Sequence, residues 1–188
     1  MHGGTVPTRY STHNLTGSPA YKLLVLRDRY CDAAVGADEA IAEANRNMAA
    51  STGYEIYLVV RQDLVDVRAD VEIWDGDPGE NRQADAWTGP TVFDLDCPTG
   101  ELVLGSPTGT YIGGIDPPQG SGRYAVALYH RGREQAEEAW REVVAVMGLP
   151  DNDARIAELL DRHAGVEQYL LRVWRKGELP PAEDDEDV

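Results

Sequence analysis

The chain has 188 residues, enough for one domain that buries a core without disulfides or a metal. Its hydrophobic fraction of 42% is that of a globular protein and excludes wholesale disorder. With 33 Asp and Glu against 17 Lys and Arg, the net charge of −16 disfavours direct binding to nucleic acids or membranes and favours a basic protein partner.

The acidity is not confined to one end of the chain. The last eleven residues contain six acids and no base, and without them 27 acids still face 17 bases, a net charge of −10. We therefore expect residues 177–188 to form an acidic, disordered tail on a body that is acidic in its own right.

The N-terminal residues 1–18 are rich in Gly, Thr, Ser and His without hydrophobic periodicity, which predicts a flexible arm. They contain no apolar segment of signal-peptide length, and nowhere do 18 apolar residues follow one another, so a cytoplasmic location is expected. Cys31 and Cys97 have neither metal-site spacing nor a disulfide framework. A bridge between them stays open, but two free buried thiols in a reducing compartment are the simpler interpretation.

The first half of the chain predicts one helix among strands. Residues 21–30 (YKLLVLRDRY) have an apolar centre of strand length, and residues 37–51 carry apolar side chains at helical spacing. A second strand is expected at 54–60. From residue 65 to 73, apolar and charged residues alternate strictly, which is typical of a half-buried strand.

The second half returns to strands after a turn. Residues 91–97 and 101–104 flank Pro98-Thr99-Gly100, which predicts a β-hairpin. Residues 105–122 are rich in Gly and Pro and are expected to form a long loop before a strand at 123–130.

Two helices and a closing strand complete the prediction. The helices span 134–147 and 151–163, with a break at Gly148-Leu149-Pro150, and the strand spans 166–174. We therefore predict a mainly β fold, an antiparallel β-sandwich of about seven strands with helical decorations near 37–51 and 132–163. A single domain would cover residues 19–176.

The C-terminal half, from Trp87 to Trp174, resembles a family of small bacterial β-sandwich proteins, the competence protein J family. The motifs that carry the resemblance are Trp87, FDLDCPTGELVLGSPTG (93–109), GRYAV (122–126) and YLLRVW (169–174), preceded by WDGDP (74–78). The resemblance implies the sandwich fold and, from the best-known member, an acidic inhibitor that binds and silences a nuclease. This chain departs from the family pattern at 132–163, where two helices are expected as an insertion.

No pattern of catalytic residues is evident. Of the four histidines, His2 and His13 fall in the predicted arm and His163 ends a helix, while His130 follows a strand next to Arg131 and Arg133. These charges would lower the basicity of His130. Nucleophilic catalysis needs a Ser or Cys with a His and an orienting carboxylate, so no catalytic residue and no cofactor are assigned.

Two ligand-binding patterns are also incomplete. The Gly-rich segments at 105–109 and 113–114 lack the spacing of a phosphate-binding loop. The loop from Asp75 to Asn81 offers oxygen ligands for Ca²⁺ but lacks the EF-hand pattern, so no metal is assigned.

The sequence therefore predicts a non-enzymatic binding protein, of inhibitor or immunity type, that engages a basic partner such as a nuclease. Asp94 and Asp96 are expected on a solvated strand face, and Tyr111 is a candidate hot spot in the loop. Two alternatives remain: an accessory module of an assembly that docks through the 132–163 helices or the long loop, and an enzyme with a site near His130. The candidate partner-binding residues are Asp63, Asp66, Asp75, Asp77, Glu80, Asp94, Asp96 and Tyr111.

Overall fold

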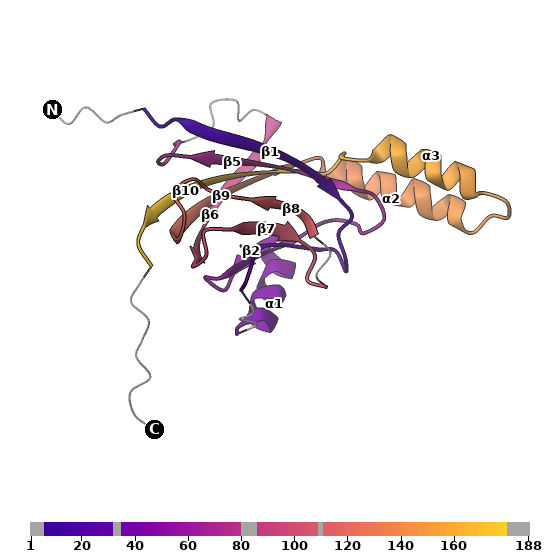
Figure 1. Cartoon of the computed structure of the whole chain (residues 1–188). Coiled ribbons are helices and arrows are strands. Elements are labelled where there is room, and N and C mark those ends of the chain that lie inside the picture. Colours follow the sequence, from indigo (N-terminus) through magenta and orange to yellow (C-terminus); the bar gives the residue numbers. More distant parts are fainter. Residues whose placement is uncertain (1–5, 32–34, 80–85, 109–110, 180–188) are drawn as a thin grey trace, which may run out of the picture.

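The computed structural model describes residues 6–31, 35–79, 86–108 and 111–179, except for the side chain of Tyr111. Figure 1 shows the arrangement of the helices and strands. The helices are α1 (Ala37–Asn47), α2 (Arg133–Met147) and α3 (Asp153–His163). The strands are β1 (Arg9–Gly17), β2 (Leu23–Asp28), β3 (Ala49–Ser51), β4 (Glu55–Val59), β5 (Val67–Trp74), β6 (Thr88–Cys97), β7 (Leu102–Gly105), β8 (Tyr111–Ile115), β9 (Gly122–Arg131) and β10 (Gln168–Gly177).

The strands form two five-stranded sheets, which confirms the mainly β prediction but corrects the strand count from seven to ten. Sheet A has the order β1-β5-β10-β9-β6, and sheet B has the order β3-β4-β2-β7-β8. The strand pairs are antiparallel except for β5 and β10, which run parallel. The α2–α3 hairpin reverses the chain after β9, so β10 runs antiparallel to β9. Strand β10 also lies next to β5, and in this direction it runs parallel to β5.

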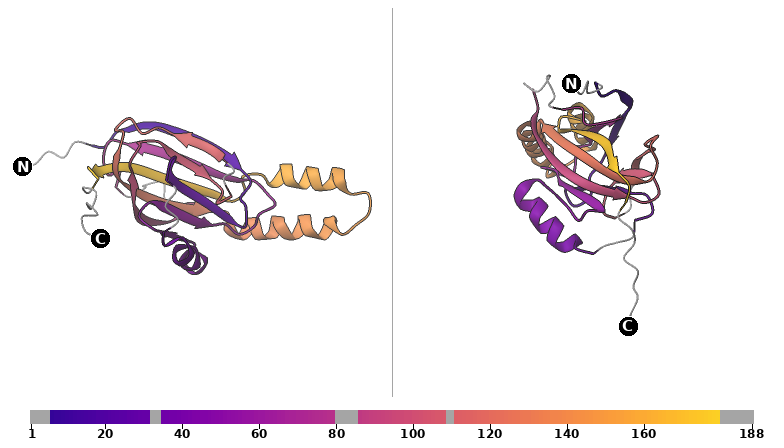
Figure 2. Two further views of the ribbon diagram at one scale, coloured as in Figure 1. Left: turned by 60° about the horizontal axis from the view of Figure 1, so that its bottom comes forward. Right: turned by 90° about the vertical axis from the view of Figure 1, so that its left-hand side faces the viewer.

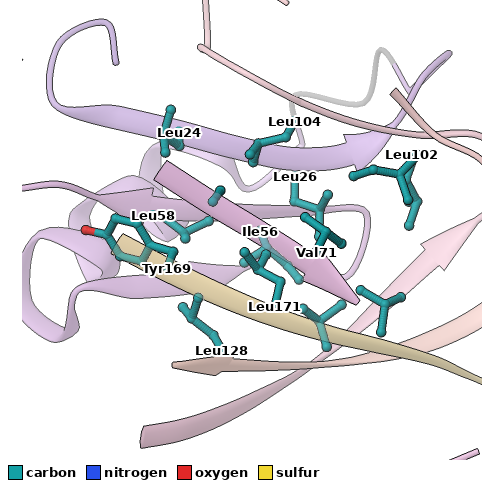
Figure 3. Packing of buried hydrophobic residues seen from close by; sticks show 14 of the residues in the cluster. Leu24, Leu26, Ile56, Leu58, Val71, Leu102, Leu104, Leu128, Tyr169 and Leu171 are labelled. Atoms are coloured by element: carbon teal, nitrogen blue, oxygen red, sulfur yellow. The ribbon is translucent and has the colours of Figure 1, made fainter. Parts of the chain in front are cut away.

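The two sheets share one buried hydrophobic core (Figure 3). Sheet A contributes the inward residues of β5, where the predicted alternation of apolar residues holds from Val67 to Ile73, and Tyr169 and Leu171 of β10. The strand begins at Val67 and not at Val65, which packs against α2 and α3 instead. Sheet B contributes Leu24, Ile56 and their neighbours from β2, β4 and β7. Burial of these side chains is the main favourable contribution to folding. We refer to the two sheets and their core as the two-sheet body.

Helix α1 covers the outer face of sheet B. Ala40 and Ala44 pack against Val25 and Tyr57, so β2 is buried on both faces. This double burial explains why β2 reads as a continuous apolar run and not as an alternating one. The helix ends at Asn47 and not at residue 51, because Ala49–Ser51 form the edge strand β3.

The predicted flexible arm is wrong for residues 9–17, which form the edge strand β1. Strand β1 pairs antiparallel with β5, from Gly17 opposite Val67 to Arg9 opposite Trp74. Its side chains do alternate in burial, but most are polar, so hydrophobic periodicity does not reveal the strand. Backbone hydrogen bonds to β5 hold the strand in place, because its mostly polar side chains bury little apolar surface.

The predicted hairpin at Pro98–Gly100 is also wrong. Strand β6 pairs with β9 in sheet A, whereas β7 pairs with β2 in sheet B. The turn therefore carries the chain from one sheet to the other. Asp28 holds it in place, since its Oδ2 accepts hydrogen bonds from the backbone N–H and the hydroxyl of Thr99, both at 2.8 Å.

The loop expected at 105–122 contains a further strand, β8. It pairs with β7, and a side chain at Gly113 would meet the Leu15 side chain of β1 at 2.4 Å. Glycine here permits a close approach between β8 and β1. In the sequence the same glycines indicate a loop, which is why β8 was not predicted.

The 132–163 segment forms the two predicted helices, which pair as a hairpin and extend away from the two-sheet body (Figure 2). None of the helices in the described part of the chain is long and apolar enough to cross a membrane. The predicted acidic tail lies outside the described residues from position 180 onward.

Candidate partner-binding surface

The predicted partner-binding residues whose side chains the structure describes do not gather on one surface. Trp74 of β5 stands opposite Trp174 of β10, which stands opposite Ala125 of β9, which stands opposite Asp94 of β6. This register places Asp75 and Asp94 at the same end of sheet A, three strands apart. Asp66 precedes β5 and therefore lies at the opposite end of the sheet.

Asp75 and Asp77 follow β5, and their carboxylates accept hydrogen bonds from backbone N–H groups. Asp75 Oδ1 accepts a hydrogen bond from the Thr8 N–H at 2.7 Å, and Asp77 Oδ1 accepts one from the Gly79 N–H at 2.8 Å. Both acids are exposed, so these contacts shape the turn without removing the charge from solvent. Glu80 and Asn81 lie outside the described residues, and with them part of the loop considered for Ca²⁺.

Asp94 and Asp96 on β6 differ from the prediction of a solvated pair. Asp94 is exposed, and its Oδ1 lies 2.8 Å from Lys176 Nζ. Asp96 is only 6% exposed, and Arg123 donates to both of its oxygens, at 2.7 and 2.9 Å. The hydrogen bond and charge of Asp96 raise the pKa of Arg123. Asp96 is thus already neutralised within the protein and is not a free acid for a partner.

Tyr111 begins strand β8 and pairs with Gly105, so it does not lie in a flexible loop as expected. Its side chain lies outside the described residues. Asp63 is exposed, and Asp66 Oδ1 accepts a 2.5 Å hydrogen bond from the Ser18 hydroxyl. These two acids lie in the β4–β5 connection, whose Leu64 and Val65 pack against α2 and α3.

The α2–α3 hairpin is fixed to the two-sheet body by a buried polar network around Glu167. This carboxylate is fully buried and accepts hydrogen bonds from the Arg61 N–H at 3.0 and 3.1 Å and from the Tyr169 hydroxyl at 2.6 Å. Arg133, at the start of α2, lies 3.3 Å from Glu167 and donates to the Val59 carbonyl and the Tyr169 hydroxyl. Burial raises the pKa of Glu167 against the opposing effects of these donors and of Arg133.

The base of the hairpin also requires glycine. Gly132 has φ of 75°, and a Cβ at this position would lie 1.9 Å from the Val166 carbonyl oxygen. The strand β9 can therefore turn directly into α2 only with glycine here. Val65 of the β4–β5 connection packs against Val143 of α2 and Leu159 of α3.

The far part of the hairpin exposes apolar side chains among acids. Val144 is 40% exposed, Met147 51% and Leu149 59%. Many other charges on the hairpin pair within it, as Glu137 does with Arg141 and Glu158 does with Arg155 and Arg162. The hairpin acids that take part in no ion pair within the described residues are Glu134, Glu138, Asp151, Asp153 and Asp161.

Together with Asp63 and Asp66 at its base, the hairpin forms an acidic surface with an apolar tip, which we call the hairpin surface. Sequence reasoning considered these helices as a docking surface only in the alternative of an accessory module and otherwise interpreted their charges as a solvated face. Met147 and Leu149 were the available signal, because apolar residues beside the Gly148 break of a two-helix hairpin have little to pack against.

The residues weighed for catalysis are separated from one another. Burial, followed by the charges of Arg133 and Arg61, lowers the pKa of His130, and within the described residues no carboxylate orients its ring. Burial and the nearby Asp28 raise the pKa of the Cys97 thiol to about 12, which suppresses its thiolate. Cys97 is a buried free thiol, and no group of three or more metal ligands occurs in the described ranges.

The comparisons with known proteins concern the fold. No family model and no curated protein matches the chain. Matching solved structures include ComJ of Bacillus subtilis, described as an inhibitor of the DNA-degrading activity of NucA. That match has a TM-score of 0.52 and 12% identity, and it covers 91% of this chain and 99% of ComJ. A second match, the gene J product of crocagin biosynthesis, has a TM-score of 0.49 and 14% identity, covering 92% and 99% of the two chains.

The resemblance inferred from residues 87–174 is thus confirmed for the fold, and it extends over most of the chain.

Proposed function

We propose that this chain is a non-enzymatic, acidic binding protein of inhibitor type, built on an antiparallel β-sandwich, that engages a basic protein partner. The observation that carries the proposal is the hairpin surface, where exposed Val144, Met147 and Leu149 lie beside the unpaired Asp151 and Asp153 and further unpaired acids follow toward the base. Apolar anchors ringed by charge are typical of protein–protein interfaces, and the charge accelerates association with a partner of opposite sign.

The fold shared with ComJ supports an inhibitor over a passive binder, because ComJ is described as the inhibitor of a nuclease. Nucleases are suitable partners on physical grounds, since a surface that binds DNA is basic. The proposed location is the cytoplasm, where Cys97 would remain a free thiol.

The test is affinity purification from the native host at low and high salt, followed by mass spectrometry and an activity assay of what is recovered. We expect a basic protein that binds at low salt, dissociates at high salt and loses its activity when the purified chain is added. Recovery of no basic partner at low salt would refute the proposal. A partner that keeps its full activity would identify an accessory module instead.

A charge-matched pair of variants locates the contact. Glu138→Gln, Asp151→Asn and Asp153→Asn remove three unpaired acids from the hairpin surface. Asp38→Asn, Glu39→Gln and Glu43→Gln remove three exposed acids from α1, outside the hairpin surface. The hairpin variant should slow association by about tenfold or more, whereas the α1 variant should have little effect. The reverse order would contradict the assigned surface.

A further inference from the structure

A cavity of about 500 Å³ opens at the end of the two-sheet body nearest to the α2 N-terminus. Its walls come from the end of α1, the residues that follow β4, the residue before β2 and the β9–α2 junction. The charged and titratable side chains that line it are Lys22, Arg46, Arg61, His130 and Arg133, and among the described residues no Asp or Glu lines it. We call it the cationic cavity. Its size is that of a small-molecule site.

The cations of the cavity differ from those elsewhere in the protein in lacking acidic partners. Within the described part of the chain, the Lys and Arg residues without a carboxylate within 4.0 Å are Lys22, Arg46, Arg61 and Arg131. Lys22, Arg46 and Arg61 all line the cationic cavity. In a chain with a net charge of −16, unpaired positive charge is therefore concentrated in one hollow.

One buried carboxylate next to the cavity offsets part of this charge. Glu167 lies 3.3 Å from Arg133, the one arginine of the cavity that is nearly buried, and its charge also acts on Arg61 without an ion pair within 4.0 Å. Lys22 makes a cation–π contact with Trp140, 6.0 Å from the ring centroid, which orients its ammonium group but leaves its charge. The positive field also acts on His130, whose pKa is lowered by burial and then by Arg133 and Arg61.

The backbone at the cavity is strained. Lys22 has φ of 60° and Met48 has φ of 75°, a left-handed region that non-glycine residues rarely adopt, and both residues line the cavity. Such strain persists where the surrounding structure enforces it, and it clusters at ligand sites.

We propose that the cationic cavity binds a phosphorylated small molecule, with Arg46, Arg61 and Lys22 contacting its phosphate and Met48 and Val59 contacting its organic part. Guanidinium groups match phosphate oxygens in bidentate geometry, and three unpaired cations match a multiply charged anion better than a single carboxylate. A cavity of about 500 Å³ is much larger than a phosphate ion alone requires, so the site has room for an organic moiety. This site is separate from the hairpin surface and does not depend on the proposed function.

Calorimetric titration of the full chain tests the proposal, with inorganic phosphate, adenosine monophosphate, pyrophosphate and citrate as probes at constant ionic strength. We expect adenosine monophosphate to bind more tightly than inorganic phosphate, and pyrophosphate more tightly than citrate. Binding of citrate above pyrophosphate would overturn the phosphate assignment. Equal binding of adenosine monophosphate and inorganic phosphate would overturn the role given to Met48 and Val59.

The variant Arg46→Gln/Arg61→Gln should reduce the affinity for pyrophosphate by at least about tenfold. The control Arg141→Gln/Arg155→Gln removes the same charge from two exposed, ion-paired arginines of the hairpin and should change it less than about twofold. The two substituted arginines, Arg46 and Arg61, are exposed, so the variant should keep its thermal stability. An equal loss in both variants would mean that only the net charge matters.

An NMR titration tests the proposal without calorimetry. In the wild type, bound pyrophosphate should raise the pKa of the His130 imidazole in an NMR titration, because an anion in the cavity stabilises the protonated ring. An unchanged His130 pKa with saturating pyrophosphate would place the ligand elsewhere and overturn the proposal.

Discussion

At the scale of single residues, Glu167 is fully buried and yet bound by two backbone contacts, a tyrosine and an arginine. Its contacts join the end of β4, the start of α2 and β10, three segments that are far apart in sequence. The sequence contains 33 acids, and nothing in the local pattern VEQYLLRVW distinguishes this one from a solvated acid.

The substitution Glu167→Ala should lower the free energy of unfolding by about 3 kcal/mol, because it leaves the Arg133 charge and the Arg61 N–H buried without their partner. Urea denaturation measures the change. Glu158→Ala, at an exposed acid of α3, is the control and should change stability by less than about 0.5 kcal/mol. Equal effects of the two substitutions would show that Glu167 does not hold the hairpin to the body.

His130 illustrates how far a local prediction reaches. The sequence predicted that Arg131 and Arg133 lower its basicity, and Arg133 does so. Arg131 lies on the other face of β9, where its guanidinium stacks 4.3 Å from the Trp87 ring centroid. The additional charge comes from Arg61, at the end of the opposite sheet, which no neighbouring sequence position indicates.

Because the folded state lowers the pKa of His130, its neutral ring favours folding above the unfolded pKa of about 6.5, and this contribution is lost as the pH falls below that value. The wild type should therefore lose more stability than His130→Gln between about pH 7 and pH 5. Glu167, whose pKa is raised, contributes the opposite trend in both proteins. Denaturant unfolding at several pH values measures the difference, and parallel curves for the two proteins would contradict it.

At the scale of elements, the α2–α3 hairpin follows its predicted bounds closely, since amphipathic periodicity and the Gly148-Leu149-Pro150 break are local signals. Its direction away from the body is not local. It depends on Gly132, on the Glu167 network and on Leu64 and Val65 of the β4–β5 connection beneath the helices.

The double substitution Met147→Ser/Leu149→Ser should leave stability within about 0.5 kcal/mol of the wild type, because both side chains are already more than half exposed. It should weaken binding of the partner recovered in the affinity experiment by about tenfold, as expected for apolar anchors. Thermal unfolding and a binding assay on the same preparation separate the two effects. A large loss of stability with no loss of binding would show that the tip is structural.

At the scale of the whole molecule, charge is segregated. Unpaired acids lie on the hairpin surface, unpaired cations lie in the cationic cavity, and on sheet A several charges pair across strands, as Glu72 does with Arg9 and Arg172. A net charge of −16 describes none of these three regions.

Strand β1 closes sheet A at one edge and contacts β8 through Leu15, so it belongs to the body and not to an arm. Removal of residues 1–17 should lower the thermal stability and cause concentration-dependent association, because the hydrogen-bonding edge of β5 becomes exposed. Removal of residues 1–5 keeps β1 and should have neither effect. Calorimetry and light scattering measure both, and a 1–17 deletion that behaves as the wild type would show that β1 is dispensable.

The candidate site was predictable only in part, because ion pairs join residues that are far apart in the sequence. Asp63 and Asp66 were named from the sequence and lie at the base of the hairpin surface, whereas Asp96 was named and is buried against Arg123. The acids of α2 were interpreted as a face that is normally solvated, and the 132–163 helices were considered for docking only in the alternative of an accessory module. The sequence around an Asp or Glu does not show whether a cation from another strand already neutralises that acid.

The sequence by itself determined the mainly β class, the three helices, the inward face of β5 and the family resemblance, because burial periodicity and turn residues are properties of neighbouring positions. Only the tertiary structure decided that β10 lies between β5 and β9, that β6 and β7 belong to different sheets, and that the segment 9–17 is a strand. It also decided which charges remain unpaired on the hairpin surface and in the cationic cavity. Strand partners and ion pairs join positions far apart in the chain, and their choice depends on the packing of the whole molecule.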